Sequence, residues 1–290
     1  MALPCGLREA RKNSTRPSGS RLHNVKMSCA TWISALIILN ASVLLQSSKT
    51  WGNDRPIFPA SKIPDGALDP QRPIVRKKIV VYHNFFRTKV QPTASNMLIM
   101  SWDEEAAEQA QRYAEQCQYL VHNDNREREL PEYGSCGQNL FAASNKTPWF
   151  FALKNWFIEY QKFKYGVPVR DLKEVGHYTQ MVWATTHKVG CGMAYCDGGP
   201  WGHFYNYVCH YCPGGNLDTL VHYPYKVGTP CADCPDDCLS GKLCKNSCPR
   251  RDVFSNCDEL LNSIPDYCNE GYCNATCECG SKSIYKNYPF

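Results

Sequence analysis

Cysteine is the residue type that most constrains this chain. The sequence of 290 residues contains 18 cysteines, and ten of them lie between Cys231 and Cys279. A segment this short cannot bury enough apolar surface to hold itself folded, so it needs cross-links. Two C-x2-C spacings, at Cys209/Cys212 and Cys231/Cys234, leave zinc binding as an alternative to disulfides. The redox compartment decides between them, because disulfides persist where thiols are oxidised.

The N-terminal residues indicate secretion. Residues 32–45 form an apolar run of 14, which is too short to span a bilayer, since a spanning helix takes about 20 residues. Lys26 precedes this run and polar residues at 46–48 follow it, which is the layout of a secretory signal cleaved near residue 48. A buried core helix is the alternative, and the polar flanks disfavour it. Translation from Met1 and translation from Met27 both fit this layout.

The positive charge of the chain lies in the same segment. The full sequence has a formal net charge of +5, and residues 1–48 contain six basic residues and one acidic residue, which also gives +5. After cleavage, 26 basic and 26 acidic residues remain, together with 16 cysteines, an even number that can pair completely. A nucleic-acid partner is disfavoured, because no excess of positive charge remains to release counterions. We therefore expect an extracellular protein with disulfides and no transmembrane segment in the mature chain.

Periodicity predicts a leader followed by three helices. Residues 49–77 contain five prolines and no strong periodicity, which is typical of an unstructured leader. Apolar residues recur at helical spacing from Lys78 to Val90 and again from Trp102 to Cys117. A third helix is expected to start at Thr147-Pro148, a capping residue followed by proline.

The segments that follow predict strands. Residues 177–186, 189–196 and 204–212 are rich in aromatic and β-branched residues, and a turn is expected at 197–199. Helices followed by a small antiparallel sheet indicate an α+β fold.

Several motifs match a known family. They are IVVYHNFFRTKVQPTASNMLIMSWDEEAAEQAQRYAEQC at 79–117, CGQNLF at 136–141, WFIEYQKFKYG at 156–166, GHYTQMVWATT at 176–186 and CHYCPGGN at 209–216. The tail adds the cysteine order C-x2-C-x3-C, then C-x3-C, and finally C-x3-C-x-C. With these motifs, residues 78–279 resemble the cysteine-rich secretory proteins (CRISPs) of the CAP superfamily, of the vertebrate, mammalian reproductive-tract type.

The resemblance implies an organisation and a disulfide pattern. It implies an α-β-α sandwich, the CAP domain, followed by a hinge and a small, mostly helical domain similar to sea-anemone potassium-channel toxins (ShK-like). The expected ranges are 1–48 for the signal peptide with its basic extension, 49–77 for the leader, 78–222 for the CAP domain, 223–247 for the hinge and 248–290 for the cysteine-rich domain. The family's pairing, carried over, gives Cys117–Cys196, Cys136–Cys212, Cys191–Cys209, Cys231–Cys238, Cys234–Cys244, Cys248–Cys279, Cys257–Cys273 and Cys268–Cys277.

The resemblance also implies a cleft with two histidines and two glutamates, where some CAP proteins bind a divalent metal. His177 and Glu159 match two of these positions. Gln138 stands in place of one glutamate, and Val121 in place of one histidine, with His122 beside it. Imidazole and carboxylate groups suit Zn²⁺ or proton relay, whereas an amide is a poor zinc ligand and no general base. The alternative is that His177 and Glu159 form a buried hydrogen-bonded pair that supports the sheet.

The residues favour binding over catalysis. Complete pairing leaves no cysteine nucleophile, no serine belongs to a motif with His177, and no cofactor is required. His203, His210 and His222 form no recognisable constellation. The resemblance implies a secreted, non-enzymatic protein that acts at the sperm surface in maturation, fertilisation or gamete interaction, with a cell-surface protein or ion channel of sperm or egg as partner. The alternatives are a sterol or lipid carrier and a metal-dependent hydrolase.

The C-terminal module has its own charge pattern. Between Cys248 and Cys279 there are two arginines, six acidic residues and no lysine, a net charge of −4. This charge disfavours a simple cationic plug in a potassium pore. Modulation of a cation channel from its extracellular face and a rigid adhesive surface are both left as interpretations. Two sequons, at Asn145 and Asn274, predict glycosylation.

Overall fold

The computed structural model describes residues 62–218, 220–250, 252–254, 256–279 and 284. The predicted signal peptide, 1–48, and the first part of the predicted leader, 49–61, lie outside these residues. Within the described ranges, no helix has the length and apolar character needed to cross a membrane.

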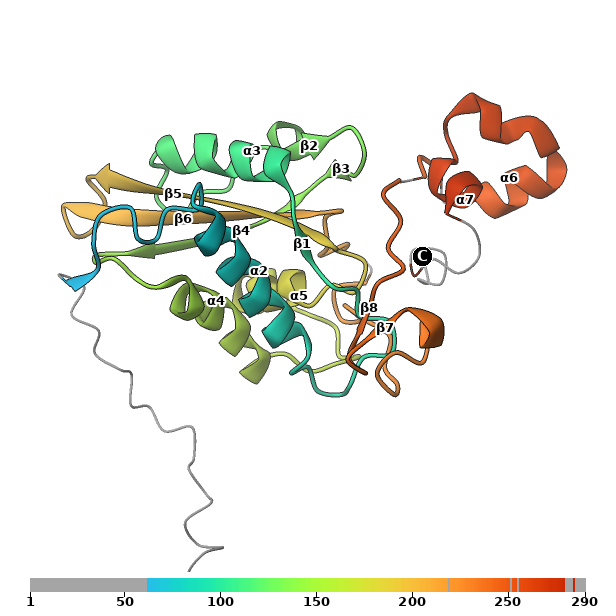
Figure 1. The fold of residues 1–290 in the computed structure, drawn as a ribbon, viewed down its shortest axis with the longest axis horizontal. Helices are drawn as coiled ribbons and strands as arrows, with labels where there is room; N and C mark the ends of the chain where they lie inside the picture. Colours follow the sequence, from blue (N-terminus) through green and yellow to red (C-terminus); the bar gives the residue numbers. More distant parts are fainter. Residues whose placement is uncertain (1–61, 219, 251, 255, 280–283, 285–290) are drawn as a thin grey trace, which may run out of the picture. The chain divides into compact units, whose positions relative to one another are not determined.

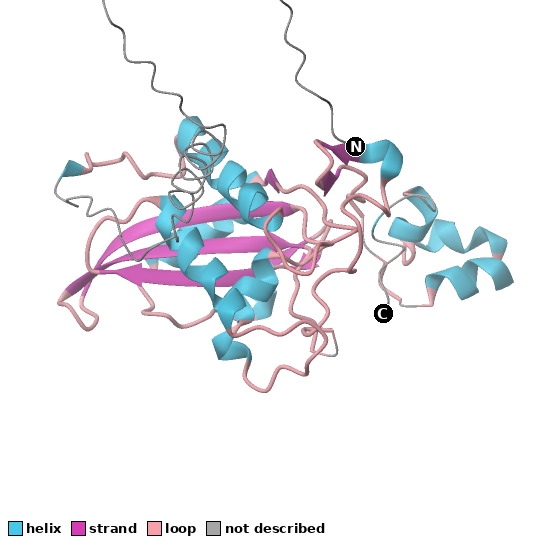
Figure 2. Cartoon of the chain, turned by 90° about the horizontal axis from the view of Figure 1, so that it is seen from below, coloured by secondary structure: helices cyan, strands magenta, loops and turns pink. Residues whose placement is uncertain are grey.

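A four-stranded sheet forms the centre of the main domain (Figure 1). Its strand order is β1-β5-β6-β4; β4, β5 and β6 are antiparallel, and the two-residue β1 is parallel to β5. Figure 2 shows the long strands side by side in magenta. The strand bounds are Ser101–Trp102 for β1, Gly137–Ala143 for β4, Lys188–Asp197 for β5 and His203–Cys212 for β6.

Helices cover both faces of this sheet (Figure 1). α3 (Glu104–Glu115) packs against β5 and β6 on one face, so closely that a Cβ on Gly190 would lie 2.1 Å from the backbone nitrogen of Ala107. The other face is covered by α2 (Pro73–Arg87), α4 (Trp149–Phe157) and α5 (Gly176–Met181), which contact one another. The prediction of an α-β-α sandwich is confirmed.

Shorter elements complete the described chain. In the main domain they are η2 (Asn125–Arg128), β2 (Glu129–Leu130), β3 (Gly134–Ser135), η3 (Ile158–Gln161) and η4 (Leu172–Glu174). In the cysteine-rich region they are η5 (Pro235–Asp237), β7 (Cys238–Leu239), β8 (Leu243–Cys244), α6 (Cys257–Ser263), η6 (Pro265–Glu270) and α7 (Asn274–Glu278). The predicted small helical domain after the hinge therefore consists of α6, η6 and α7.

The prediction of an unstructured leader is wrong for its C-terminal part. α2 begins at Pro73, where proline occupies the first helical turn and loses no hydrogen bond there. Before it, the indole nitrogen of Trp149 donates to Leu68 O (2.7 Å), and Lys146 forms an ion pair with Asp65. These contacts, made by residues far along the chain, order a segment that has no periodicity of its own.

The second helix is shorter than its apolar periodicity predicts. Asp103 is its N-cap, and Oδ1 accepts from Ala106 N (2.9 Å). Trp102, which the periodicity places in this helix, belongs to β1 instead and pairs with Val189. The third helix starts one residue later than predicted, because its N-cap is Pro148 and not Thr147.

The strand predicted over 177–186 is wrong. Residues 176–181 form α5, and turns follow. Two tertiary contacts override the local preference. The carboxylate of Glu159 accepts from the backbone N–H groups of His177 (3.0 Å) and Tyr178 (3.1 Å), and the guanidinium of Arg87 donates to Met181 O (2.9 Å). The first contact satisfies the free N–H groups of a helix start.

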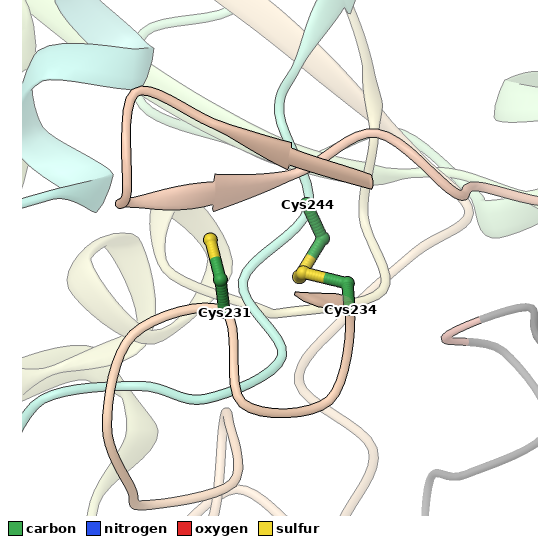
Figure 3. Close-up of side chains that lie close together, drawn as sticks. All are labelled: Cys231, Cys234 and Cys244. Carbon is green, nitrogen blue, oxygen red and sulfur yellow. A yellow bond between two sulfur atoms is a disulfide. The ribbon is translucent and has the colours of Figure 1, made fainter. Parts of the chain in front are cut away.

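Eight disulfides cross-link the described chain, and they join the pairs that the resemblance implies. Figure 3 shows the sulfurs of Cys231, Cys234 and Cys244, which lie within 4.8 Å of one another, with the bond between Cys234 and Cys244. Sulfurs in disulfides are not thiolates, the form that binds zinc, so this group favours cross-linking over a zinc site. The pairs are Cys117–Cys196, Cys136–Cys212, Cys191–Cys209, Cys231–Cys238, Cys234–Cys244, Cys248–Cys279, Cys257–Cys273 and Cys268–Cys277.

Candidate functional site: two oriented histidines at the edge of the sheet

The candidate site lies along β4, which is an edge strand of the sheet. Successive side chains of a strand point to opposite faces. Gln138 contacts the loop that follows α3, whereas the side chain of Asn139 donates to the backbone oxygen of His177 in α5 (3.1 Å). The edge strand therefore joins two groups of residues that are far apart in sequence.

The first group is the pair His177 and Glu159. Nδ1 of His177 lies 2.6 Å from Glu159 Oε1, and the ring stacks on the buried Trp156 with centroids 6.2 Å apart. Glu159 Oε2 accepts the two backbone N–H groups that begin α5. The carboxylate thus holds both the ring and its helix, and the proton on Nδ1 leaves Nε2 as a lone pair in the neutral ring.

The second group is built around Gln138. Its Oε1 lies 2.7 Å from His122 Nδ1, and its Nε2 lies 3.0 Å from Asn123 Oδ1 and 3.1 Å from His210 Nε2. His122 is exposed to solvent, whereas Gln138 and His210 are buried. The displaced histidine after Val121 therefore does reach the site, and an amide holds its ring.

The two histidine groups influence each other electrostatically. Partial burial of the ring lowers the pKa of His122, the hydrogen bond with Gln138 opposes this shift, and the electrostatic influence of Arg128 and His177 lowers the pKa further. Burial lowers the pKa of His210 to about 3, so this ring is neutral at physiological pH. Both rings beside Gln138 are therefore biased toward the neutral form, which is the form that binds metals.

This donor set fits a divalent cation of the zinc type. Imidazole nitrogen is a common zinc ligand, and a ligating histidine usually donates its other N–H to a carboxylate or carbonyl that fixes the ring. His122 and His177 both meet this description, with Gln138 and Glu159 as the fixing groups. Glu159 is already hydrogen-bonded to His177 and to the start of α5, so His122 and His177 are the residues that would hold such a cation.

His210 is the site residue that the sequence analysis missed. It forms no motif by itself, yet the antiparallel register of β4 and β6 places it directly opposite Gln138. A strand prediction at 137–143 aligned with the predicted strand at 204–212 would have found this pair.

A buried histidine–tyrosine pair elsewhere in the domain is structural. His83 Nε2 lies 2.9 Å from the hydroxyl of Tyr211, and neither residue is exposed to solvent. His83 Nδ1 also lies 2.9 Å from Ile79 O, one helical turn earlier. A substrate has no access to this pair, so it offers no nucleophile and base for hydrolysis.

The two sequons differ in their surroundings. Asn145 is exposed in the loop before α4. Asn274 is half-buried, and Thr276 of the same sequon is buried, with its hydroxyl donating to Asp252 Oδ2 (2.6 Å). Asn145 is the more accessible acceptor in the folded protein.

We expect Glu159→Ala to weaken zinc binding by about 10- to 100-fold, the usual effect of removing a group that orients a metal ligand. The same change removes the acceptor for two N–H groups of α5, which is expected to lower the free energy of unfolding by about 1 kcal/mol. Calorimetric titration with Zn²⁺ and urea unfolding measure the two effects. Glu174→Ala is the matched control, because Glu174 is in an exposed ion pair with Lys162 and such pairs contribute little. Unchanged zinc affinity in Glu159→Ala would contradict the assignment.

The α-β-α sandwich and the disulfide-rich region that follows it define a CAP-type protein, and comparison with known proteins agrees. The family model described as "Cysteine-rich secretory protein family" (CAP) matches residues 80–211, and the model "Crisp" matches residues 231–284. The chain belongs to the cysteine-rich secretory protein family.

Individual relatives share most of their length with this chain. It is 43% identical to human cysteine-rich secretory protein 2 over 251 residues, which are 85% of this chain and 97% of the relative. It is 42% identical to the cysteine-rich venom protein helothermine of Heloderma horridum horridum over 217 residues, 73% of this chain and 87% of the relative. Among solved structures, NaASP2 with Zn²⁺ is similar, with a TM-score of 0.50, 28% identity, and coverage of 63% of this chain and 99% of that one.

Proposed function

We propose that this protein is a secreted, non-enzymatic binding protein that acts at the sperm surface in maturation, fertilisation or gamete interaction and modulates cation channels. The similarity to a human secretory protein and to a venom protein supports an extracellular role. The observation that carries the binding role is the C-terminal module, in which three disulfides hold exposed aromatic side chains. Cross-linking of the mature protein to live sperm, followed by identification of the partner, tests the setting. Absence of a partner above background would refute it.

The exposed apolar group of this module is formed by Val253 together with the aromatic residues Phe254 and Tyr272. Their exposed fractions are 53%, 40% and 45%, and the rings of Phe254 and Tyr272 are 5.4 Å apart. Val253 N donates to Tyr272 O (2.7 Å), and Cys273, the next residue, is bonded to Cys257. A cross-linked backbone thus presents large apolar side chains at low entropic cost, which is typical of interface anchors.

We expect the double change Phe254→Ala and Tyr272→Ala to weaken the protein as a channel modulator. The concentration that gives a half-maximal effect on cation currents should rise at least about tenfold, the usual result of removing interface anchors. Patch-clamp recording from sperm, with the full mature protein in the bath, provides the measurement. Tyr195→Ala is the matched control, because Tyr195 is a 56% exposed tyrosine on β5 of the main domain. Equal potency of the double variant and the unchanged protein would contradict the proposal.

A second function is supported by the two oriented histidines. We propose that His122 and His177 bind a divalent cation such as Zn²⁺ through their Nε2 atoms. Support comes from the fixed Nδ1 positions of both rings and from the similarity of the chain to the structure of NaASP2 with Zn²⁺. Calorimetric titration with Zn²⁺, compared between the unchanged protein and His177→Ala, tests it. Equal affinity would remove His177 from the site.

Two alternatives make different demands. A sterol or lipid carrier requires saturable binding of a tritiated sterol, and its absence excludes that function. A metal-dependent hydrolase requires a reproducible peptidase activity that His177→Ala abolishes.

A further inference from the structure

A buried arginine sets the direction of a chain of hydrogen bonds that ends at the candidate site. Arg128 is 7% exposed. Its guanidinium donates to Cys136 O (3.0 Å), to Asn123 O (2.6 Å) and to Asn123 Oδ1 (2.8 Å). A guanidinium has five N–H donors and no acceptor, so every partner atom must accept. The side-chain oxygen of Asn123, and not its nitrogen, therefore faces Arg128.

Asn123 transmits this direction to Gln138. Its Nδ2 donates to the carboxylate of Glu127 (3.1 Å), so both ends of the amide are fixed. Oδ1 of Asn123 also lies 3.0 Å from the side-chain nitrogen of Gln138. Because Oδ1 accepts, the group of Gln138 that faces it must be the NH₂ group. The oxygen of Gln138 then points the other way.

Gln138 in turn fixes the protons of two histidines. Its Oε1 is an acceptor 2.7 Å from His122 Nδ1, so Nδ1 must carry a proton. Its NH₂ group lies 3.1 Å from Nε2 of the buried His210, so that nitrogen accepts. A neutral imidazole carries one N–H proton, so the Nε2 atom of neutral His122 has a free lone pair.

We infer that Arg128 and Asn123 are positioning residues that fix the tautomer of His122 and so leave its Nε2 lone pair available to a divalent cation. The inference rests on the cation site proposed above. It gives the amide at position 138 the orienting role that the Glu159 carboxylate has toward His177. The site thereby keeps two oriented imidazoles with one carboxylate instead of two.

The series of hydrogen bonds from Arg128 through Asn123 to Gln138, called the relay below, is needed because a carboxylate and an amide differ in symmetry. Both oxygens of Glu159 accept, so either can hold Nδ1–H of His177. The amide of Gln138 can be turned end for end, and its NH₂ group would then face His122. That orientation favours the tautomer with the proton on Nε2, which blocks the nitrogen that a cation would use. The acceptor Oδ1 of Asn123 excludes this orientation, because it requires the NH₂ group of Gln138 to face Asn123.

Two variants at this position separate the effect of hydrogen-bond direction from simple packing. Asn123→Leu removes the acceptor. Asn123→Asp combined with Glu127→Gln keeps an oxygen that accepts from both Arg128 and Gln138, and it avoids two facing carboxylates, because Asn123 Nδ2 donates to Glu127 in the unchanged protein. We expect Asn123→Leu to weaken Zn²⁺ binding about tenfold, as loss of an orienting partner does. We expect the zinc affinity of the double variant Asn123→Asp/Glu127→Gln to stay within about threefold of that of the unchanged protein, because the direction of the hydrogen bonds is preserved. The measurement is calorimetric titration of the full mature protein with ZnCl₂.

A second readout needs no metal. Long-range ¹H–¹⁵N NMR of the metal-free protein reports which ring nitrogen of His122 carries the proton. Protonated Nδ1 in the unchanged protein and in Asn123→Asp/Glu127→Gln, with a mixture of tautomers in Asn123→Leu, supports the relay. Protonated Nε2 in the unchanged protein overturns it, and so does equal weakening of zinc binding by both variants. The expected tautomers without any zinc binding would support the relay and refute the proposed cation site.

Discussion

Replacing Arg87 with methionine is expected to lower the free energy of unfolding by more than about 4 kcal/mol and to leave little folded protein. Arg87 is 1% exposed, and its guanidinium donates to the backbone oxygens of five described residues. Each buried acceptor left without a donor costs about 1–3 kcal/mol. Methionine fills similar space but donates nothing. The acceptors are the oxygens of Leu98, Met181, Trp183, Ala184 and Thr186.

The location of these oxygens explains the size of the effect. They belong to residue 98 and to the segment 181–186, which Arg87 binds together. The oxygens of Ala184 and Trp183 also accept from Leu98 N (3.1 Å) and Thr186 N (3.2 Å), so the loss falls mainly on the oxygens of Leu98, Met181 and Thr186. Urea unfolding of the mature protein, or the yield of secreted protein where unfolding is too easy to measure, tests the expectation. Arg87→Lys is the graded control, because an ammonium has three donors in place of five. A loss below about 1 kcal/mol in Arg87→Met would show that water or other groups replace the guanidinium.

Acid is expected to unfold the protein over a range set by buried histidines. Desolvation by burial lowers the pKa of His83 and of His187 to about 4 and that of His210 to about 3, from an ordinary value of 6.5. Because the folded values lie below the unfolded value, the unfolded chain binds protons that the folded chain does not. The stabilisation is fully present above about pH 6.5 and is lost as the pH falls toward 4.

The expected slope is steep. Three protons taken up on unfolding give at most about 4 kcal/mol per pH unit between these pKa values. Urea unfolding at a series of pH values measures it. His187→Phe is the matched variant, because its ring packs against Tyr133 and, within the part of the chain that the structure describes, Nε2 of His187 has no hydrogen-bond partner. That variant should reduce the slope by about one third. A free energy of unfolding that is constant from pH 6.5 to 4.5 would contradict the burial of neutral histidines.

The helices of the main domain were largely predictable because their signals are local. The apolar stripe and the acidic residues at 103–105 fix α3, and the stripe from Ile79 onward fixes most of α2. The start of α2 at Pro73 was missed, since the segment before it is ordered by Lys146 and Trp149, which lie more than 70 residues further along the chain. Local patterns carry no information about such partners.

Residues 177–186 show the same limit more sharply. Their aromatic and β-branched composition favours a strand, but the carboxylate of Glu159 supplies the acceptors that a helix start needs, and Arg87 binds the carbonyls that follow. The free energy of these contacts exceeds the preference of the segment, which amounts to tenths of a kcal/mol per residue. Neither contact can be derived from the segment itself.

The sequence by itself determined the cross-linked, two-part organisation and the α+β class, because cysteine number, spacing and periodicity are properties of the chain. It also identified His177, Glu159, Gln138 and the displaced His122, although only by resemblance. The tertiary structure alone decided how they act together. Strand register places His210 against Gln138, and a buried arginine fixes the direction of the hydrogen bonds. Such directions depend on which donor faces which acceptor, and that is known only once the chain has folded.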